Sequence, residues 1–250
     1  REQFSDTNFL WEVEAPDVAA SAQPGQFIMV RLHEGSERVP LTVADFDRER
    51  GTITLVVQAL GKTTQEMRDR YHEGDFFADF VGPMGLPTHI GNVGHVVLVG
   101  GGLGVAPVFP QLRAYKEAGC RVTGIIGFRN KDLIFWEDRF AEYCDDLIVC
   151  TDDGSYGRPG FVTEALLDVV NNSHPDLAIA IGPMPMMRAC VETTRPSGTK
   201  TMVSLNSIMV DGTGMCGSCR VTVDGVVKFA CVDGPDFDGH AVDFKELLVR

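Results

Sequence analysis

The sequence has no surplus of positive charge and no long apolar segment. Its 22 Lys and Arg residues stand against 35 Asp and Glu residues, giving a net charge of −13. Such a chain lacks the basic excess that neutralises phosphates, so we expect no nucleic-acid partner. No apolar run approaches the roughly 20 residues that a membrane span needs, and we expect no span. Hydrophobic residues make up 44% of the chain and charged residues 23%, the balance of a globular protein.

Signs of acid–base or nucleophilic catalysis are also missing. The six histidines are scattered along the chain and show neither the spacing of a metal site nor that of a catalytic triad. We therefore predict that no side chain acts as a general acid or nucleophile.

The seven cysteines fall into two groups. Four of them are scattered through apolar or helical segments, where a reduced cysteine serves as a small hydrophobic residue; they are Cys120, Cys144, Cys150 and Cys190. The other three lie within sixteen positions among glycines. This usage favours a metal site in a reducing compartment over a disulfide framework, and it predicts a cytoplasmic location.

The clustered cysteines have the spacing of an iron–sulfur loop with one position changed. Cys216, Cys219 and Cys231 follow the pattern C-x2-C-x11-C, and plant-type [2Fe–2S] loops have the form C-x4-C-x2-C…C. The first position is Asp211 instead of cysteine. By spacing alone this is either a cluster with a carboxylate ligand or a loop that has lost its cluster. Three cysteines kept at full spacing beside four glycines favour the cluster.

The first ninety residues have the pattern of a small β domain. Short β-rich runs at 11–16, 27–32, 41–46 and 52–60 are separated by turn sequences such as QPGQ and HEGSE. The glycine- and proline-containing stretch 81–87 is expected to close this domain. Five or six short strands predict a barrel.

The pattern then changes to alternating strands and helices. Residues 95–128 predict a buried strand, a glycine turn, a helix and a second strand. The alternation continues with a helix, strand, helix and strand near 132–144, 147–150, 161–170 and 177–182. This βαβ series predicts an open parallel sheet. From about Thr201 the chain becomes rich in glycine and cysteine. We therefore expect three parts, at 1–92, 93–200 and 201–250.

Glycine-bearing loops follow three predicted strands of the sheet. The loop 100–104 opens a helix, where backbone N–H groups can approach a pyrophosphate. Loops 151–157 and 182–186 also follow strand ends, and ligands bind outside those ends in open α/β sheets. The three loops are expected to converge on a nucleotide. Glycines needed only for packing, and plain solvated turns, are the alternatives.

Two polar segments of the β domain suggest a second anion site. Pro40, Leu41 and Thr42 lie on a predicted strand, and the segment 61–64 (GKTT) opens a predicted helix. Thr hydroxyls and free N–H groups at a helix start attract anions. An ordinary helix cap explains the second segment equally well.

The order of these motifs along nearly the whole chain resembles the ferredoxin–NADP reductase superfamily, in the branch of dihydroorotate dehydrogenase electron-transfer subunits. The tail D-x4-C-x2-C-x11-C is more similar to the small subunits of bifurcating NADH-dependent reduced ferredoxin:NADP⁺ oxidoreductases and of sulfide dehydrogenases. In that group an aspartate is the fourth cluster ligand. The resemblance implies an FAD-binding β-barrel, an NAD(H)-binding α/β domain with a parallel sheet, and a small C-terminal [2Fe–2S] segment.

The resemblance also assigns residues to each cofactor. FAD would be bound by Arg38, Pro40, Leu41, Thr42, Val57, Gly61, Thr63 and Thr64, with the Thr42 hydroxyl at the flavin N5. Val39 stands where the family has its arginine, and Arg38 is displaced by one residue. NAD(H) would be bound by Gly101, Gly102, Gly104, Val105, Ala106, Pro107, Asp152, Asp153, Gly154, Gly182, Pro183 and Met184. The [2Fe–2S] cluster would be bound by Asp211, Cys216, Cys219 and Cys231. The run 129–131 (RNK) could hold the 2′-phosphate of NADP, but NAD(H) is favoured.

These assignments predict an electron-transfer subunit of a flavin-based electron-bifurcating ferredoxin:NADP⁺ transhydrogenase complex. A chain with a single cluster needs an acceptor for its electrons, so we expect a larger subunit that carries its own flavin and [4Fe–4S] clusters, and ferredoxin reached through that complex. The electron-transfer subunit of dihydroorotate dehydrogenase or of sulfide dehydrogenase is the main alternative. Asp211 argues against the dihydroorotate dehydrogenase type, where four cysteines are expected. A non-catalytic redox sensor is a third reading.

Overall fold

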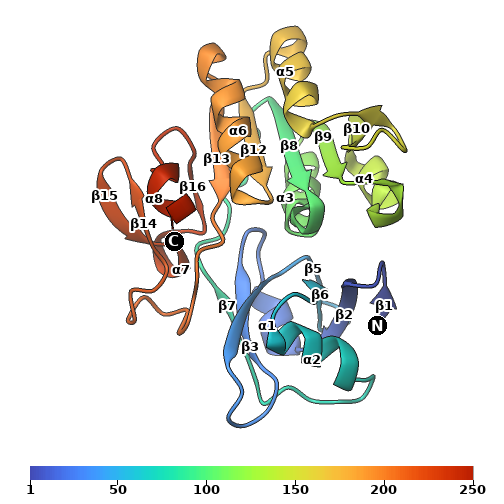
Figure 1. Ribbon diagram of the computed structural model, residues 1–250, viewed down its shortest axis with the longest axis vertical. Helices are drawn as coiled ribbons and strands as arrows, with labels where there is room; N and C mark the ends of the chain where they lie inside the picture. Colours follow the sequence, from blue (N-terminus) through green and yellow to red (C-terminus); the bar gives the residue numbers. More distant parts are fainter. Residues whose placement is uncertain (250) are drawn as a thin grey trace.

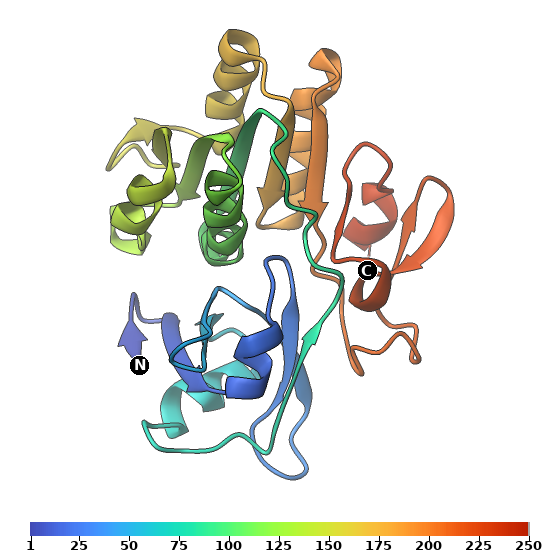
Figure 2. The same cartoon turned by 180° about the vertical axis from the view of Figure 1, so that it is seen from behind.

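The computed structural model describes residues 1–249, which form two lobes and a tail beside them (Figure 1). We call residues 1–84 the N-terminal lobe, and the elements of the parallel sheet with its covering helices the second lobe. The tail, residues 205–249, lies at one side of both lobes, as the front and back views agree (Figure 2).

The N-terminal lobe consists of two antiparallel sheets packed on one core. One sheet has the order β1 (Glu2–Gln3), β2 (Asn8–Glu14), β6 (Thr52–Gln58), β5 (Asp45–Asp47); the other has the order β4 (Arg38–Thr42), β3 (Phe27–Arg31), β7 (Asp79–Met84). Alternate residues of β6 enter the shared core, as the period of two predicts. Among the described residues the strands are hydrogen-bonded as two sheets rather than as the continuous sheet of a closed barrel.

Two predicted segments of this lobe differ in the structure. The single strand expected at 41–46 is two strands, because the chain passes from one sheet to the other at Val43 and Ala44, so that β4 pairs with β3 and β5 pairs with β6. The loop expected at 81–87 begins as a strand, since β7 runs to Met84 and pairs with β3. β7 lies at the edge of its sheet, where a proline in the strand is tolerated.

Two helices complete the N-terminal lobe, α1 (Pro16–Ser21) and α2 (Lys62–Arg70). The helix expected to open at 61–64 is α2, which begins directly after Gly61. It contributes Met67 to the core that the two sheets share.

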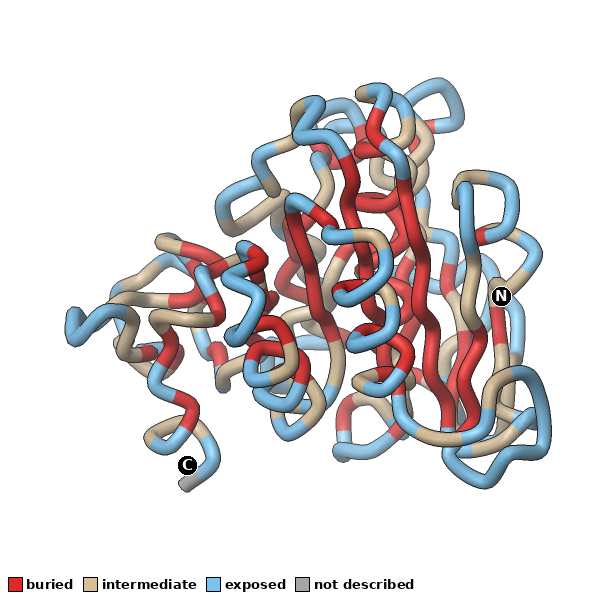
Figure 3. Tube along the Cα trace, turned by 90° about the horizontal axis from the view of Figure 1, so that it is seen from above, coloured by how far each residue is buried: buried red, intermediate tan, exposed pale blue. Residues whose placement is uncertain are grey.

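The second lobe is built on a seven-stranded sheet. Its order is β11 (Arg158–Pro159), β10 (Asp146–Thr151), β9 (Arg121–Phe128), β8 (His95–Gly101), β12 (Leu177–Ile181), β13 (Lys200–Ser204), β16 (Asp236–Asp238). All neighbours are parallel except β16, which is antiparallel to β13. The central strands are buried along their length, as their continuous apolar runs predict (Figure 3). The sheet thus takes in β13 and β16 from the region expected to form a separate tail.

Helices cover both faces of this sheet. α3 (Val105–Glu117) and α4 (Glu137–Tyr143) share one core with Val96 and Leu98, whereas α5 (Val162–Ser173) and α6 (Met184–Thr194) share the other with Val97 and Val99. α4 is shorter than the helix predicted at 132–144. A 3-10 turn (Lys131–Leu133) precedes it, and Trp136, with φ of 62°, breaks the helical path before Glu137.

The tail holds a hairpin and two short helices around the cysteine-rich loop. Its elements are β14 (Arg220–Val223), β15 (Val226–Phe229), α7 (Ala230–Asp233) and α8 (Phe244–Val249). Within the described part of the chain, no helix combines the length and the hydrophobicity required to cross a bilayer.

Candidate functional site

A cleft of about 1070 Å³ lies between the two lobes, at the carboxyl ends of β8 and β12. Along the chain the sheet grows from β8 toward β9 and β10 on one side, and later toward β12 and β13 on the other. The loops after β8 and β12 therefore diverge and leave a crevice, which is where open α/β sheets bind their ligands. The N-terminal lobe closes the opposite side of the cleft.

Most of the residues predicted to bind cofactors line this one cleft. They are Pro40, Leu41, Thr42, Val57 and Thr64 from the N-terminal lobe, and Gly101, Gly102, Gly104, Ala106, Pro107, Asp152, Gly182 and Pro183 from the second lobe. Segments more than a hundred residues apart in the sequence thus face a single cavity. All three predicted loops reach this cleft, the loop 151–157 through Asp152.

Other predicted cofactor residues do not line the cleft; they are Arg38, Gly61, Thr63, Val105, Asp153, Gly154 and Met184. Arg38 donates from Nη2 to Asp79 Oδ2 at 2.9 Å, within its own lobe. The Thr63 hydroxyl donates to the Glu37 carboxylate, and Val105, the first residue of α3, is buried in the core. The Arg38 and Thr63 side chains are thus held by partners that are distant in the sequence.

The glycines of the first loop serve two different purposes. A Cβ on Gly104 would lie 2.3 Å from the Ile181 carbonyl oxygen, and one on Gly101 would lie 2.2 Å from Met186 Sδ. Packing therefore requires glycine at 104, where the close atoms belong to the backbone, whereas at 101 the flexible Met186 side chain could move aside. Gly102 has φ of 54° and no heavy atom within 4 Å of its Cβ position. Its backbone stays open to the cleft at the start of α3, where N–H groups favour an anion.

The start of α2 is capped by its own side chain. Thr64 Oγ1 accepts hydrogen bonds from the N–H groups of Leu60 and Gly61, each at 3.1 Å. The helix-cap reading of this segment is therefore correct for the Thr64 hydroxyl, which nevertheless also faces the cleft.

Several polar residues of the cleft were not predicted. Asn8 and Gln58 are paired across β2 and β6, and Asn206 follows the carboxyl end of β13. Arg129, the first residue of the run 129–131 considered for a 2′-phosphate, also lines the cleft after β9. Arg129 and Asp152 are the only residues of full charge among the described residues that line the cleft. Asn206 could have been predicted, because it follows the carboxyl end of a parallel strand as the other loops do. The positions of Asn8 and Gln58 could not, because they depend on how β2 and β6 pair.

The four predicted cluster ligands lie on and beside one loop of the tail. Asp211 accepts hydrogen bonds from the N–H groups of Thr213 at 2.8 Å and Cys216 at 2.7 Å. The sulfur atoms of Cys219 and Cys231 are 3.2 Å apart and both residues are buried, whereas Cys216 is exposed. The residues thus form two pairs, Asp211 with Cys216 and Cys219 with Cys231.

The electrostatics of the loop differ between its thiols. Burial, the hydrogen bond to Cys219 and the nearby charges of Cys219 and Asp211 raise the pKa of Cys231 to about 12. Hydrogen bonds from the side chain and N–H of Ser218 lower the pKa of Cys216. Hydrogen bonds from the Thr213 and Cys216 N–H groups lower the pKa of Asp211. A buried thiol such as Cys231 becomes a thiolate only if a cation compensates its charge.

These residues fit a two-iron cluster better than a single ion. Within residues 1–249, no three His, Cys, Asp or Glu side chains converge closely enough to hold one metal ion. A [2Fe–2S] cluster takes two protein ligands at each iron, and the loop offers two pairs.

The ligand loop lies directly beside the cleft. Met209, two residues before Asp211, lines the cleft. A Cβ on Gly212 would lie 2.7 Å from Met84 Sδ and 2.9 Å from Met29 Cγ, so the loop packs tightly on β7 and β3. The candidate flavin, nucleotide and cluster positions therefore adjoin one another.

Comparison with known proteins agrees with this arrangement. Residues 206–243 match the family described as the iron–sulfur cluster binding domain of dihydroorotate dehydrogenase B. The chain is 50% identical to a dihydroorotate dehydrogenase B (NAD⁺) electron transfer subunit homolog from Thermotoga maritima, over 99% of this chain and 87% of that protein. It is 30% identical to the corresponding subunit from Fusobacterium nucleatum, over 97% of this chain and 95% of that protein.

A solved structure resembles the chain over almost its full length. It is a chain of the NADH-dependent reduced ferredoxin–NADP oxidoreductase, with a TM-score of 0.93 and 48% identity, covering 99% of this chain and 89% of that one. The predicted resemblance is thereby confirmed. Since homology extends from the β lobe through the cysteine-rich tail, the chain belongs to the family of dihydroorotate dehydrogenase B electron-transfer subunits.

Proposed function

We propose that the chain passes electrons between NAD(H), FAD and a [2Fe–2S] cluster as a subunit of a flavin-based electron-bifurcating ferredoxin:NADP⁺ transhydrogenase complex. The observation that carries this proposal is the single cleft, which brings the flavin and nucleotide segments together next to the cysteine-rich loop. The three predicted parts, 1–92, 93–200 and 201–250, would supply one cofactor each.

FAD would lie against the N-terminal lobe. Bound there, it would exchange a hydride with NAD(H) and single electrons with the cluster. Leu41 would pack on the flavin ring and the Thr42 hydroxyl would hydrogen-bond at N5, because both face the cleft from β4. Pro40, Val57 and the start of α2 would form the remaining wall. Arg38 would reach a phosphate only by leaving Asp79.

NAD(H) would lie against the second lobe. The open backbone at Gly102 and the N-terminus of α3 would hold its pyrophosphate. We favour NAD(H) over NADP(H), as the family resemblance implies. The Asp152 carboxylate would accept a ribose hydroxyl, and Arg129, the other charged residue of the cleft, is the group that a 2′-phosphate would need. Pro183 and its neighbours would contact the nicotinamide end.

The cluster would be held by the two pairs of the tail loop, with Asp211 as its oxygen ligand. A carboxylate carries the same formal charge as a thiolate but is a harder and less covalent donor. We expect this substitution to raise the reduction potential relative to an all-thiolate cluster.

A larger flavin- and [4Fe–4S]-containing subunit would take electrons from this cluster, and ferredoxin would be reached through that complex. Apolar side chains around the ligand loop support a partner on this face. Met215 is 89% exposed and Ile208 71% exposed; Val210 is exposed in the same segment, and Val232, also exposed, packs beside Gly214. Clustered apolar exposure of this kind is typical of a protein–protein interface.

An electron-transfer subunit of dihydroorotate dehydrogenase is the second candidate. The match to the Fusobacterium nucleatum subunit over 97% of the chain favours it. Asp211 argues against it, since four cysteine ligands are expected in that enzyme. The sulfide dehydrogenase small subunit shares the aspartate pattern and stays an alternative, while a redox sensor without turnover is the weakest.

Anaerobic co-purification with the native partner tests this assignment. We expect this chain to contribute about one FAD and two irons with two labile sulfides, in addition to the flavin and [4Fe–4S] clusters of the larger subunit, and we expect NADH to reduce a dye. The complex should then couple NADH, NADP⁺ and ferredoxin. NADH-dependent interconversion of dihydroorotate and orotate would establish the second candidate, and bound flavin without dye reduction would establish the sensor.

A further inference from the structure

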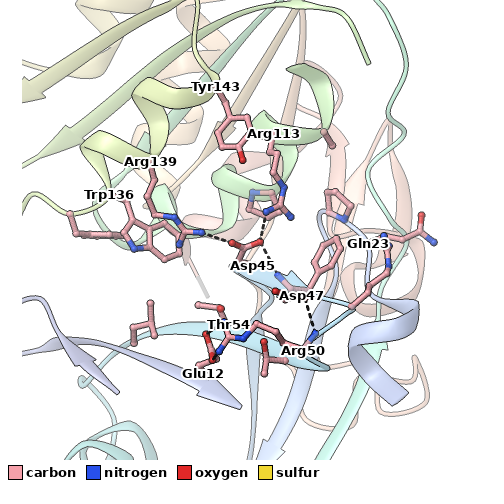
Figure 4. Close-up of a pocket in the computed structure, with 18 of the residues that line it drawn as sticks. Glu12, Gln23, Asp45, Asp47, Arg50, Thr54, Arg113, Trp136, Arg139 and Tyr143 are labelled. Carbon is pink, nitrogen blue, oxygen red and sulfur yellow. Dashed lines mark hydrogen bonds and ion pairs between the residues drawn. The ribbon is translucent and has the colours of Figure 1, made fainter. Parts of the chain in front are cut away.

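A second cleft, of about 1460 Å³, lies between the N-terminal lobe and helices α3 and α4 (Figure 4). It shares no lining residue with the cofactor cleft. Several ion pairs form its wall; the Arg50 guanidinium, for example, binds the Glu12 carboxylate.

Asp45 connects the two lobes at this wall. It lies on β5 of the N-terminal lobe, and its side chain is only 12% exposed. Its carboxylate forms an ion pair with Arg113 Nη1 at 2.8 Å and accepts a hydrogen bond from Arg139 Nη2 at 2.5 Å, as the dashed lines in Figure 4 mark. Arg113 belongs to α3 and Arg139 to α4, so one carboxylate holds two helices of the other lobe. Such charge-assisted hydrogen bonds are stronger than neutral ones.

Aromatic rings keep both guanidinium groups in place. The Arg139 guanidinium lies 4.4 Å from the ring centroids of Phe109 and Trp136. Arg113 lies 5.5 Å from the ring of Phe46, which neighbours Asp45 on β5. Because each arginine is held by a ring as well as by the carboxylate, the contact has little freedom to shift. We call Asp45, Arg113 and Arg139 the lobe clamp.

Helix α3 links the lobe clamp to the cofactor cleft. Its first turn follows the glycine loop that lines the cofactor cleft, and Arg113 lies eight residues after Val105. At 1.5 Å per residue that is about 12 Å along one helix. Because α3 packs on both β8 and β9, it moves as a rigid body. The lobe clamp therefore fixes the position of the glycine loop relative to the N-terminal lobe.

We propose that Asp45 is a positioning residue, which sets the separation between the flavin-binding wall on β4 and the nucleotide-binding loop at the start of α3. The proposal rests on the function proposed above. Asp45 touches no substrate and acts only through the lobe geometry. Hydride transfer needs reacting atoms about 3–3.5 Å apart, and a displacement of 1 Å can cost about a hundredfold in rate.

The test compares Asp45→Asn with a matched control in purified flavin-loaded protein. The control is Asp145→Asn, which removes an ion pair to Lys116 of the same helix but stays within the second lobe. For Asp45→Asn we expect reduction of the flavin by NADH in anaerobic stopped flow to slow about tenfold at saturating NADH. The NADH concentration at half-maximal rate should change less than threefold, and flavin content should not change. The control should stay within twofold of the parent.

A second readout reports the lobes directly. Small-angle X-ray scattering of Asp45→Asn should show a larger radius of gyration or a broader distance distribution than the parent and control. If Asp45→Asn does not fold, Arg139→Gln and Asp45→Glu replace it, with the glutamate recovering part of the lost rate. A parent-like rate and scattering profile in these variants overturns the proposal. A parent protein that binds flavin but is not reduced by NADH instead contradicts the proposed function itself.

Discussion

Replacing Gly104 by alanine tests whether the junction of α3 and β12 forms the nucleotide site. The added Cβ would lie 2.3 Å from the Ile181 carbonyl oxygen and 2.6 Å from its carbonyl carbon. Both neighbours are backbone atoms of β12, so the clash is relieved only by moving the start of α3 by about 1 Å. Overpacking of this kind typically costs about 1–3 kcal/mol of folding stability.

The expected effect on binding is larger than the effect on stability. The movement displaces Gly102 and Gly182, which line the cofactor cleft from either side of the clash. We therefore expect NADH to bind at least tenfold more weakly to Gly104→Ala, measured by titration of the flavin-loaded protein, with flavin content unchanged.

A matched overpacking variant separates the two effects. Gly124 lies on β9 and does not line the cofactor cleft. In Gly124→Ala the added Cβ would lie 2.6 Å from Cys144 Sγ. Urea unfolding should show a loss of similar size for both variants. Parent-like NADH affinity in Gly104→Ala, or equal weakening in both variants, would refute this account of the loop.

Four further predictions follow from particular groups. Asp211→Cys should retain the cluster, with a reduction potential lower than that of the parent protein. Redox titration monitored by electron paramagnetic resonance measures this potential, and an unchanged value contradicts oxygen ligation. Thr42→Val should keep the flavin but slow its reduction by NADH about fivefold in stopped flow, the size expected for one hydrogen bond of about 1 kcal/mol. In cofactor-free protein, iodoacetamide should modify Cys216 well before Cys231, because Cys216 is exposed with a lowered pKa, while burial raises the pKa of Cys231; peptide mass mapping checks the order. Burial also raises the pKa of Asp236 above its ordinary value near 4. The folded state therefore binds this proton more tightly than the unfolded state does. As a result, the free energy of unfolding falls as pH rises from about 4 toward the raised pKa. Urea unfolding of Asp236→Asn should lack this decline, and an identical pH dependence in both proteins speaks against a neutral buried acid.

The second lobe could be predicted well because its signals are local. Buried parallel strands have continuous apolar sequences, and each glycine loop directly follows a strand end. The N-terminal lobe was harder, since nothing in the sequence of 41–46 marks the change from one sheet to the other. β16 has only three residues, and it joins the sheet through pairing with β13 rather than through a strand signal of its own.

Those parts of the site that depend on the position of the backbone could be predicted from the sequence. The glycine loops and the segment 40–42 needed only strand order to be brought together. The partner of Arg38 could not be predicted, because Asp79 lies 41 residues away and reaches it only through the pairing of β4, β3 and β7. Asp45 was missed for the same reason, since both of its arginines belong to the other lobe.

Anaerobic titration of the isolated chain with NADH addresses the relay from nucleotide to cluster most directly. As NADH is added, visible absorbance should show bleaching of the flavin, and low-temperature electron paramagnetic resonance should show the signal of a reduced [2Fe–2S] centre in the same sample. Protein that binds flavin and iron yet transfers no electrons from NADH to the iron–sulfur centre, or that contains neither group, would contradict the account.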